Sequence, residues 1–132
     1  MAGFAFHHVG VACRELDHDE GLFRALGYKR EGPDWDDEIQ GVRARFLTGA
    51  GPRIELVCNL EGRSVLTSVL KSGTKFYHVA YEVADLDGAS ATLASLGGKQ
   101  VAGPMPGIAF GMRVLCFFMM PNLMLVELIS RV

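Results

Sequence analysis

The stretch that decides the fold is Phe6-His7-His8-Val9-Gly10-Val11-Ala12, because a similar stretch, Phe76-Tyr77-His78-Val79-Ala80-Tyr81, occurs in the second half of the chain. Other short segments recur at the spacing that separates His8 from His78: Glu15-Leu16-Asp17 as Asp85-Leu86-Asp87, Ala25-Leu26-Gly27 as Ser95-Leu96-Gly97, and Gly41-Val42-Arg43 as Gly111-Met112-Arg113. Ile54-Glu55-Leu56 recurs as Val126-Glu127-Leu128 at a slightly larger spacing, which indicates two inserted residues. Repetition at a nearly constant distance predicts two copies of one structural module.

The residue pattern within each copy predicts a strand, a helix and then three strands. Alternation of Val42, Ala44 and Phe46 with Arg43 and Arg45 is typical of a half-buried strand. In the first copy we expect strands at 4–12, 28–31, 41–48 and 53–58, a helix at 17–26 capped by Asp17, and an acidic loop at 35–39. In the second we expect strands at 76–83, 99–101, 113–119 and 124–130 and a helix at 85–96, with a linker helix at 64–71 between the copies.

The size and composition of the chain indicate one compact domain with an apolar core. The chain has 132 residues, of which 49% are apolar, and a formal net charge of -2. This low net charge argues against nucleic acid or an anionic membrane as the partner. The cysteines Cys13, Cys58 and Cys116 are odd in number and far apart, which predicts reduced, buried thiols. Because the N-terminus has no signal-peptide pattern, we expect a cytoplasmic protein.

Each copy places one histidine in its first strand and one glutamate in its last. Successive residues of a strand point to opposite faces, so His8 and His78 point away from the valines that follow them. The residues on either side of Glu55 and Glu127 are apolar, and we expect them to pack against the helices, so the two glutamates also point to the opposite face. A single such residue is usually an ordinary polar group at a sheet surface. Equivalent positions in both copies instead predict a metal-ligand set of two imidazoles and two carboxylates: His8, Glu55, His78 and Glu127.

Taken in order, these segments resemble the vicinal oxygen chelate superfamily, which includes glyoxalase I, bleomycin resistance proteins, extradiol dioxygenases and methylmalonyl-CoA epimerase. The resemblance rests on 6–12, 76–83 and 125–128, and segments 40–43 and 53–56 are most similar to the epimerase-like branch. It implies an α+β fold in which paired βαβββ modules form a curled mixed sheet around a metal cavity. The implied single glyoxalase-like domain, 1–132, contains module one (4–59), a linker helix (60–74) and module two (75–132), and we expect a homodimer. The modules could pair within one chain or between two.

The resemblance also implies the chemistry of the site. The family's ligands for one divalent ion (Co, Ni, Mn, Fe or Zn) match four residues of this chain: His8, Glu55, His78 and Glu127. The implied reaction is an epimerisation or isomerisation by proton transfer next to a metal-bound carbonyl. Glu127 matches the ligand that also acts as a base. The second acid would come from Asp36, Asp37 or Glu38, of which Glu38 is the best positional match; the alternative is a solvated acidic loop.

Other functions fit parts of the pattern. A glyoxalase I-type lyase would use the same ligands on a thiol adduct, and an antibiotic-binding resistance protein would only bind a small molecule. An extradiol dioxygenase fits less well, because Glu55 would fill a position that its iron must keep open. The expected substrate is a small molecule such as an acyl thioester. Segments 104–110 and 119–123 depart from the epimerase pattern, which argues against recognition of CoA and favours the same metal chemistry on another acyl or sugar-like substrate.

Three arginines, Arg43, Arg45 and Arg113, lie on the polar faces of the predicted strands. Guanidinium groups bind carboxylates or phosphates, either of a ligand or within the protein. We favour internal ion pairs for these three. His7 has the opposite strand parity to His8, and His18 falls in the first turn of a helix, so neither is a predicted ligand.

Overall fold

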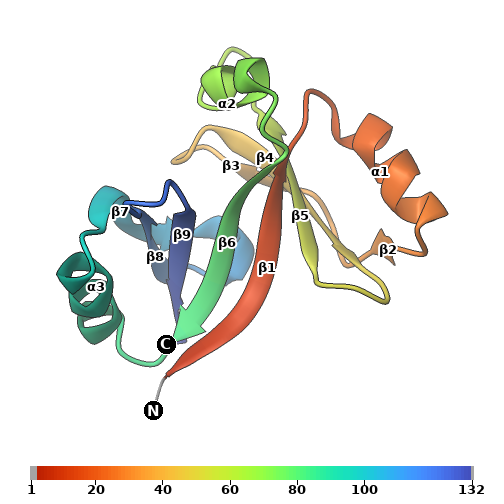
Figure 1. Cartoon of the computed structure of the whole chain (residues 1–132). Helices are drawn as coiled ribbons and strands as arrows, with labels where there is room; N and C mark the ends of the chain where they lie inside the picture. Colours follow the sequence, from red (N-terminus) through yellow and green to blue (C-terminus); the bar gives the residue numbers. More distant parts are fainter. Residues whose placement is uncertain (1–2, 132) are drawn as a thin grey trace. The chain divides into compact units, whose positions relative to one another are not determined.

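The chain combines strands and helices as the sequence predicts. The computed structural model describes residues 3–131, and within them it contains nine strands, three α-helices and one short 3-10 helix (Figure 1). The chain forms two compact units. The first unit is His8–Tyr77. The second unit consists of residues 3–7 together with residues 78–131. None of the helices in the described residues is long and apolar enough to cross a membrane.

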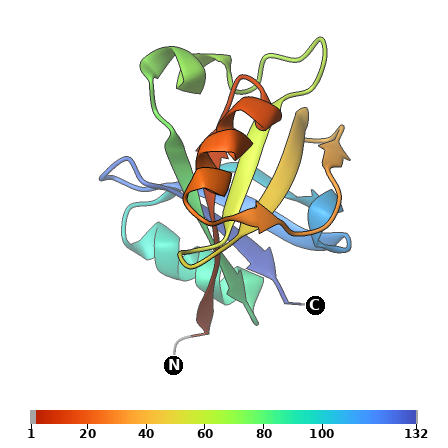
Figure 2. The same cartoon turned by 90° about the vertical axis from the view of Figure 1, so that its right-hand side faces the viewer.

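The first unit contains most of the first copy of the repeat. Its elements are β1 (Phe4–Ala12, shared with the second unit), α1 (Leu16–Ala25), β2 (Lys29–Arg30), β3 (Trp35–Asp37), β4 (Val42–Thr48), β5 (Ile54–Asn59) and α2 (Thr67–Ser72). The strands follow the order β2-β4-β5-β1, with β1 parallel to β5 and β3 antiparallel to β4. Helix α1 covers one face of β4 and β5 (Figure 2). The core between them includes Leu16, Phe23, Leu47, Ile54 and Leu56.

The second unit repeats this plan. Its elements are β6 (Phe76–Val83), α3 (Leu86–Ser95), β7 (Lys99–Gly107), the 3-10 helix η1 (Ile108–Phe110), β8 (Arg113–Met119) and β9 (Leu125–Ser130). The order is β6-β9-β8-β7, with β6 parallel to β9 and the other neighbours antiparallel. Helix α3 packs on the sheet through Ala89, Leu86 and Leu93. Asp85 begins this helix by accepting a hydrogen bond from the backbone N–H of Gly88 at 3.0 Å.

Three local predictions are wrong. Asp17 does not cap α1, which begins one residue earlier; its N-cap is Glu15, and that side chain makes no capping hydrogen bond. Residues 35–37, predicted as loop, form β3 on the edge of β4. The strand predicted at 99–101 extends to Gly107, with irregular pairing to β8 along its length. The three cysteines are free and buried, as predicted.

The strand register shows that one match in the repeat is displaced by a single position. Phe46 lies opposite Glu55 on β5, and Phe117 lies opposite Glu127 on β9. Phe46 of β4 and Phe117 of β8 are therefore the equivalent residues of the two copies. The number of residues from Phe46 to Phe117 is one greater than the number from Gly41-Val42-Arg43 to Gly111-Met112-Arg113. A shift of one position exchanges the two faces of a strand. Arg43 and Arg113 are consequently not equivalent residues.

A buried ion cluster holds α1 against β4. Glu20 is 3% exposed and accepts hydrogen bonds from Arg24, Arg30 and Arg45 at 2.6–2.9 Å. Burial alone would raise the pKa of Glu20, but the guanidinium groups of Arg30 and Arg24 outweigh it, so its pKa lies below the usual value. The contribution of this carboxylate to stability is therefore complete above the ordinary glutamate pKa of 4.5 and is lost as the pH falls through the lowered value.

We expect Glu20→Gln to destabilise the protein by about 3 kcal/mol at neutral pH, because it removes the buried negative charge that the arginines share. Urea denaturation measures the loss. The matched control is Asp17→Asn, since the side chain of Asp17 also binds Arg45 but is 84% exposed; its cost should stay below about 1 kcal/mol. Equal losses in the two variants would contradict this account, as would a Glu20→Gln deficit that does not shrink in acid.

Candidate functional site

The first candidate pair is His8 on β1 and Glu55 on β5. Glu55 lies opposite Gly10 in the parallel pairing of these strands, and His8 precedes Gly10 by two residues on the same face. This placement brings His8 Nε2 to 3.0 Å from Glu55 Oε1. His8 is fully buried, and only 8% of Glu55 is exposed. The ring of Phe46 meets the His8 imidazole edge to face at 5.4 Å between centroids.

The second pair, His78 on β6 and Glu127 on β9, is built in the same way. Glu127 lies opposite Ala80, two residues after His78. His78 Nε2 is 3.2 Å from Glu127 Oε1, and both residues are buried. The ring of Phe117 meets the His78 imidazole at 5.5 Å, again nearly perpendicular. Each unit thus contains a buried histidine–carboxylate pair with a phenylalanine beside the imidazole.

The two phenylalanines are site residues that the sequence prediction missed. Each lies directly across from the glutamate of its pair and packs edge to face against the histidine ring. The sequence did contain a signal that Phe46 and Phe117 are equivalent residues. Their spacing along the chain is one position longer than that from His8 to His78 and one position shorter than that from Glu55 to Glu127. The incorrect match of Gly41-Val42-Arg43 to Gly111-Met112-Arg113 concealed it.

The donors of both pairs are suitable for a divalent metal ion. Imidazole nitrogen and carboxylate oxygen are the ligands that ions such as Zn, Fe, Co and Ni prefer in proteins. Two such atoms, each about 2.1 Å from one ion, are about 3.0 Å apart at the right angles of an octahedral site and about 3.4 Å apart at tetrahedral angles. The separations of 3.0 and 3.2 Å within the pairs fall in this range, and they equally suit a hydrogen bond between imidazole and carboxylate. The geometry of each pair is therefore compatible with metal ligation.

The acidic segment gives its three carboxylates different roles. Asp36 faces Arg43 across the β3–β4 pairing and accepts two hydrogen bonds from it, at 2.6 and 3.0 Å, which lowers the pKa of Asp36. Asp37 is buried and accepts hydrogen bonds from the backbone and side-chain amides of Gln40. Glu38 is exposed, and within residues 3–131 its carboxylate has no hydrogen bond or ion pair. Of the three acids, Glu38 is the one available to a ligand.

The arginines form internal ion pairs, as we favoured from the sequence. Arg45 is paired with carboxylates of α1 and of the turn before β3, and Arg43 with Asp36. Arg113 donates to Glu82 at 2.6 Å and to the carbonyl oxygens of Phe110 and Ser130. The hydrogen bond from Arg113 is the main reason that the pKa of Glu82 lies below its usual value.

His7 and His18 belong to neither pair. His7 packs edge to face on Phe110, and His18 is an exposed residue of α1 beside Asp19.

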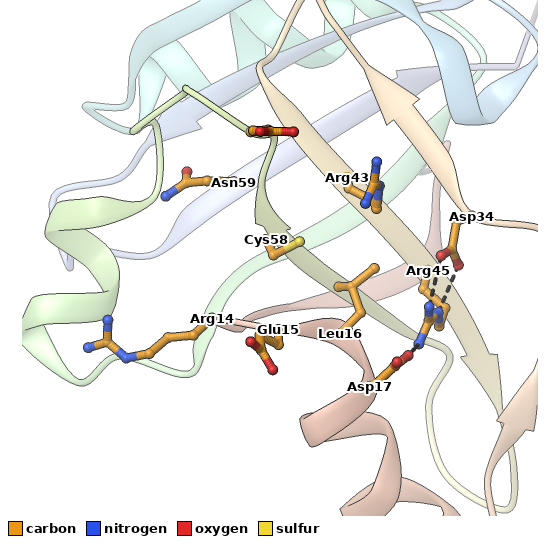
Figure 3. A pocket seen from close by; sticks show the side chains of 10 residues that line it. Arg14, Glu15, Leu16, Asp17, Asp34, Arg43, Arg45, Cys58 and Asn59 are labelled. Carbon is orange, nitrogen blue, oxygen red and sulfur yellow. Dashed lines mark hydrogen bonds and ion pairs between the residues drawn. The ribbon is translucent and has the colours of Figure 1, made fainter.

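A separate polar cavity of about 410 Å³ opens on the α1 side of the first unit (Figure 3). Arg43, Arg45 and Cys58 contribute to its wall. Arg45 and Cys58 belong to the face of β4 and β5 that packs toward α1, whereas Phe46 and Glu55 alternate onto the other face. The cavity is therefore distinct from the His8–Glu55 pair.

A family model for the glyoxalase/bleomycin resistance protein/dioxygenase superfamily matches residues 7–117. The chain belongs to this superfamily, as the resemblance in its sequence predicted, and its α+β fold is glyoxalase-like. A comparison with curated proteins gave no match.

Solved structures are similar over nearly the whole chain. A hypothetical protein from Bacillus halodurans C-125 is 22% identical, covers 99% of this chain and 96% of its own, and has a TM-score of 0.81, which supports the fold alone. Methylmalonyl-CoA epimerase from Mycobacterium tuberculosis is 26% identical over 97% of this chain and 88% of its own, with a TM-score of 0.77. A variant of the Streptomyces coelicolor methylmalonyl-CoA epimerase in complex with 2-nitronate-propionyl-CoA is 25% identical over 98% of each chain, with a TM-score of 0.74.

Proposed function

We propose that this protein is a metal-dependent epimerase or isomerase that moves a proton at the carbon next to a substrate carbonyl. The observation that carries the proposal is the repeated buried pair, His8 with Glu55 and His78 with Glu127. The similarity to methylmalonyl-CoA epimerases supports the reaction class. In this proposal the two pairs serve a single glyoxalase-like domain, 1–132, which assembles as a homodimer.

The two pairs would together ligate one divalent ion, with each residue offering one nitrogen or oxygen atom. Two imidazoles and two carboxylates suit Co, Ni, Mn, Fe or Zn. When bound, such an ion supplies Lewis-acid stabilisation of the negative charge that develops on a substrate carbonyl oxygen. Phe46 and Phe117 would keep the imidazoles oriented, since each packs against one histidine ring.

Epimerisation needs a proton acceptor on one face of the reacting carbon and a donor on the other. We assign these roles to Glu127 and Glu38. Glu127 is 2% exposed and fixed on β9, so its carboxylate is held in one position. Glu38 is exposed, and its carboxylate is not engaged within residues 3–131. Either glutamate could accept the proton, depending on the configuration of the substrate, while the other donates.

An acyl thioester is the substrate class that we propose. A thioester carbonyl acidifies the neighbouring C–H bond, which suits a carboxylate base. The Mycobacterium tuberculosis relative is named for methylmalonyl-CoA, and the Streptomyces coelicolor relative is in complex with an acyl-CoA analogue. A glyoxalase I-type lyase would use the same donors on a thiol adduct, so the experiment must separate the two reactions.

We expect the metal-loaded protein in D2O, screened on a panel of acyl thioesters that includes methylmalonyl-CoA, to exchange the α-proton of at least one of them and to interconvert its epimers at least about a hundred times faster than the metal-stripped protein. Proton NMR follows both processes. A thioester without an α-hydrogen, such as pivaloyl-CoA, is the control and should stay unchanged. Isomerisation of a glutathione hemithioacetal without exchange on any acyl thioester would favour the lyase. Binding of small molecules without turnover of either class would favour a resistance-type binding protein.

A further inference from the structure

The segment that carries Glu38 is fastened to the first unit at several points. Strand β3 contributes three residue pairs with β4, and Asp36 adds its ion pair to Arg43. After β3, Asp37 accepts hydrogen bonds from Gln40, and Arg63 donates to the carbonyl oxygen of Glu38 at 3.1 Å. Glu38 therefore projects from a turn that these contacts attach to the first unit.

The attachment before β3 is the strongest of these points. Asp34 accepts two parallel hydrogen bonds from Arg45, Nε to Oδ1 at 2.7 Å and Nη2 to Oδ2 at 2.8 Å (Figure 3). This two-point geometry fixes direction as well as distance. The pKa of Asp34 lies below its usual value, chiefly because of these bonds, so Asp34 is ionised at neutral pH.

Arg45 is itself held firmly. Only 5% of it is exposed, and its Nη1 donates to Glu20 and to Asp17 of α1, each at 2.7 Å. Glu20 is buried and is also bound by Arg30. Asp34 therefore attaches the acidic segment to a buried cluster that joins α1 to β4. By contrast, Asp36 and Arg43 are both about half exposed, and an exposed pair of this kind contributes little.

We propose that Asp34 is a positioning residue for Glu38, acting through its two-point bond to Arg45. This inference rests on the proposed role of Glu38 in proton transfer. A strand of three residues has few backbone hydrogen bonds of its own, so its start depends on Asp34. Release of that end would let Glu38 move by an ångström or more, a displacement that can cost about a hundredfold in rate. Asp34 neither donates nor accepts the transferred proton.

The test compares Asp34→Asn with Asp17→Asn. Both changes remove a carboxylate bound to Arg45, but only Asp34 leads into β3, while Asp17 lies on α1. We expect Asp34→Asn to lower kcat for epimerisation by about tenfold to a hundredfold, with KM and metal content unchanged. Deuterium exchange on one face of the substrate should persist, because Glu127 is untouched. Asp17→Asn should keep the wild-type kcat, and Asp34→Glu should recover part of the loss.

A second measurement does not depend on activity. Amide hydrogen exchange on the metal-free protein should be faster at residues 35–40 in Asp34→Asn and unchanged there in Asp17→Asn. Unchanged exchange in Asp34→Asn, or equal acceleration in both variants, would overturn the proposed attachment. If amide hydrogen exchange at residues 35–40 is faster in Asp34→Asn but its kcat for epimerisation is unchanged, Asp34 holds the segment without positioning a catalytic group, and the proposal is wrong. If Glu38→Gln turns over normally while exchange in Asp34→Asn is still faster, the role given to Glu38 fails and the attachment stands.

Discussion

Replacement of His78 by alanine is expected to remove the bound metal ion, from about one ion per chain to less than about a tenth of that at limiting metal. Loss of residues that only support a ligand already lowers metal affinity about tenfold to a hundredfold, so loss of a ligand should exceed this range. Glu127→Ala should have the same effect, because it removes the other half of the pair. Metal analysis of dialysed protein measures the stoichiometry, and His18→Ala is the control, since His18 is exposed and separate from both pairs.

The same measurement on His8→Ala and Glu55→Ala tests whether the two pairs serve one ion. A single shared ion requires that all four variants lose it. If the His78 and Glu127 variants lose metal while those of His8 and Glu55 retain it, the ion depends on one unit alone. Unchanged stoichiometry in both His78→Ala and Glu127→Ala would remove the metal assignment and, with it, the proposed reaction.

The candidate residues could be predicted because their positions depend on short-range rules. Strand parity and the repeat predict that the histidine and the glutamate occupy equivalent positions in the two copies. The parallel pairings agree with this prediction, because Glu55 lies opposite Gly10 and Glu127 opposite Ala80, each two residues after the histidine. A parallel pairing of this kind needs only the order of the elements and the register. The order of the elements and the register are repeated in the two copies, although the match of Gly41-Val42-Arg43 to Gly111-Met112-Arg113 was one position out of register.

Features that depend on long-range contacts were not predictable in this way. Aspartate is disfavoured in strands, yet Trp35-Asp36-Asp37 forms β3, because Arg43 and the backbone of β4 lie opposite it. Asp17 was expected to cap α1, but its carboxylate instead binds Arg45, 28 residues further along the chain. No local pattern indicates which distant guanidinium group an exposed aspartate will find.

Substitution of Glu38 by glutamine should leave the metal in place and lower epimerising turnover by about a hundredfold to ten-thousandfold, the usual contribution of a general acid or base. Glutamine has nearly the same shape but cannot accept or release the proton. Deuterium should still enter from the face served by Glu127, so the substrate exchanges without being epimerised. NMR of the exchanged substrate and a chiral assay of the product distinguish these two processes.

Asp36→Asn and Asp37→Asn are the matched controls for Glu38→Gln, because each removes one negative charge from the same short segment. Asp36 is bound to Arg43 and Asp37 to Gln40, so neither carboxylate is available for proton transfer. Asp36→Asn should stay within about threefold of the wild-type rate, since the lost pair is exposed. Asp37→Asn can lower the rate by disturbing the turn, but it should not separate exchange from epimerisation. If all three variants turn over an identified substrate at the wild-type rate, the two-base mechanism is wrong, and the lyase and binding alternatives become the better explanations of the buried pairs.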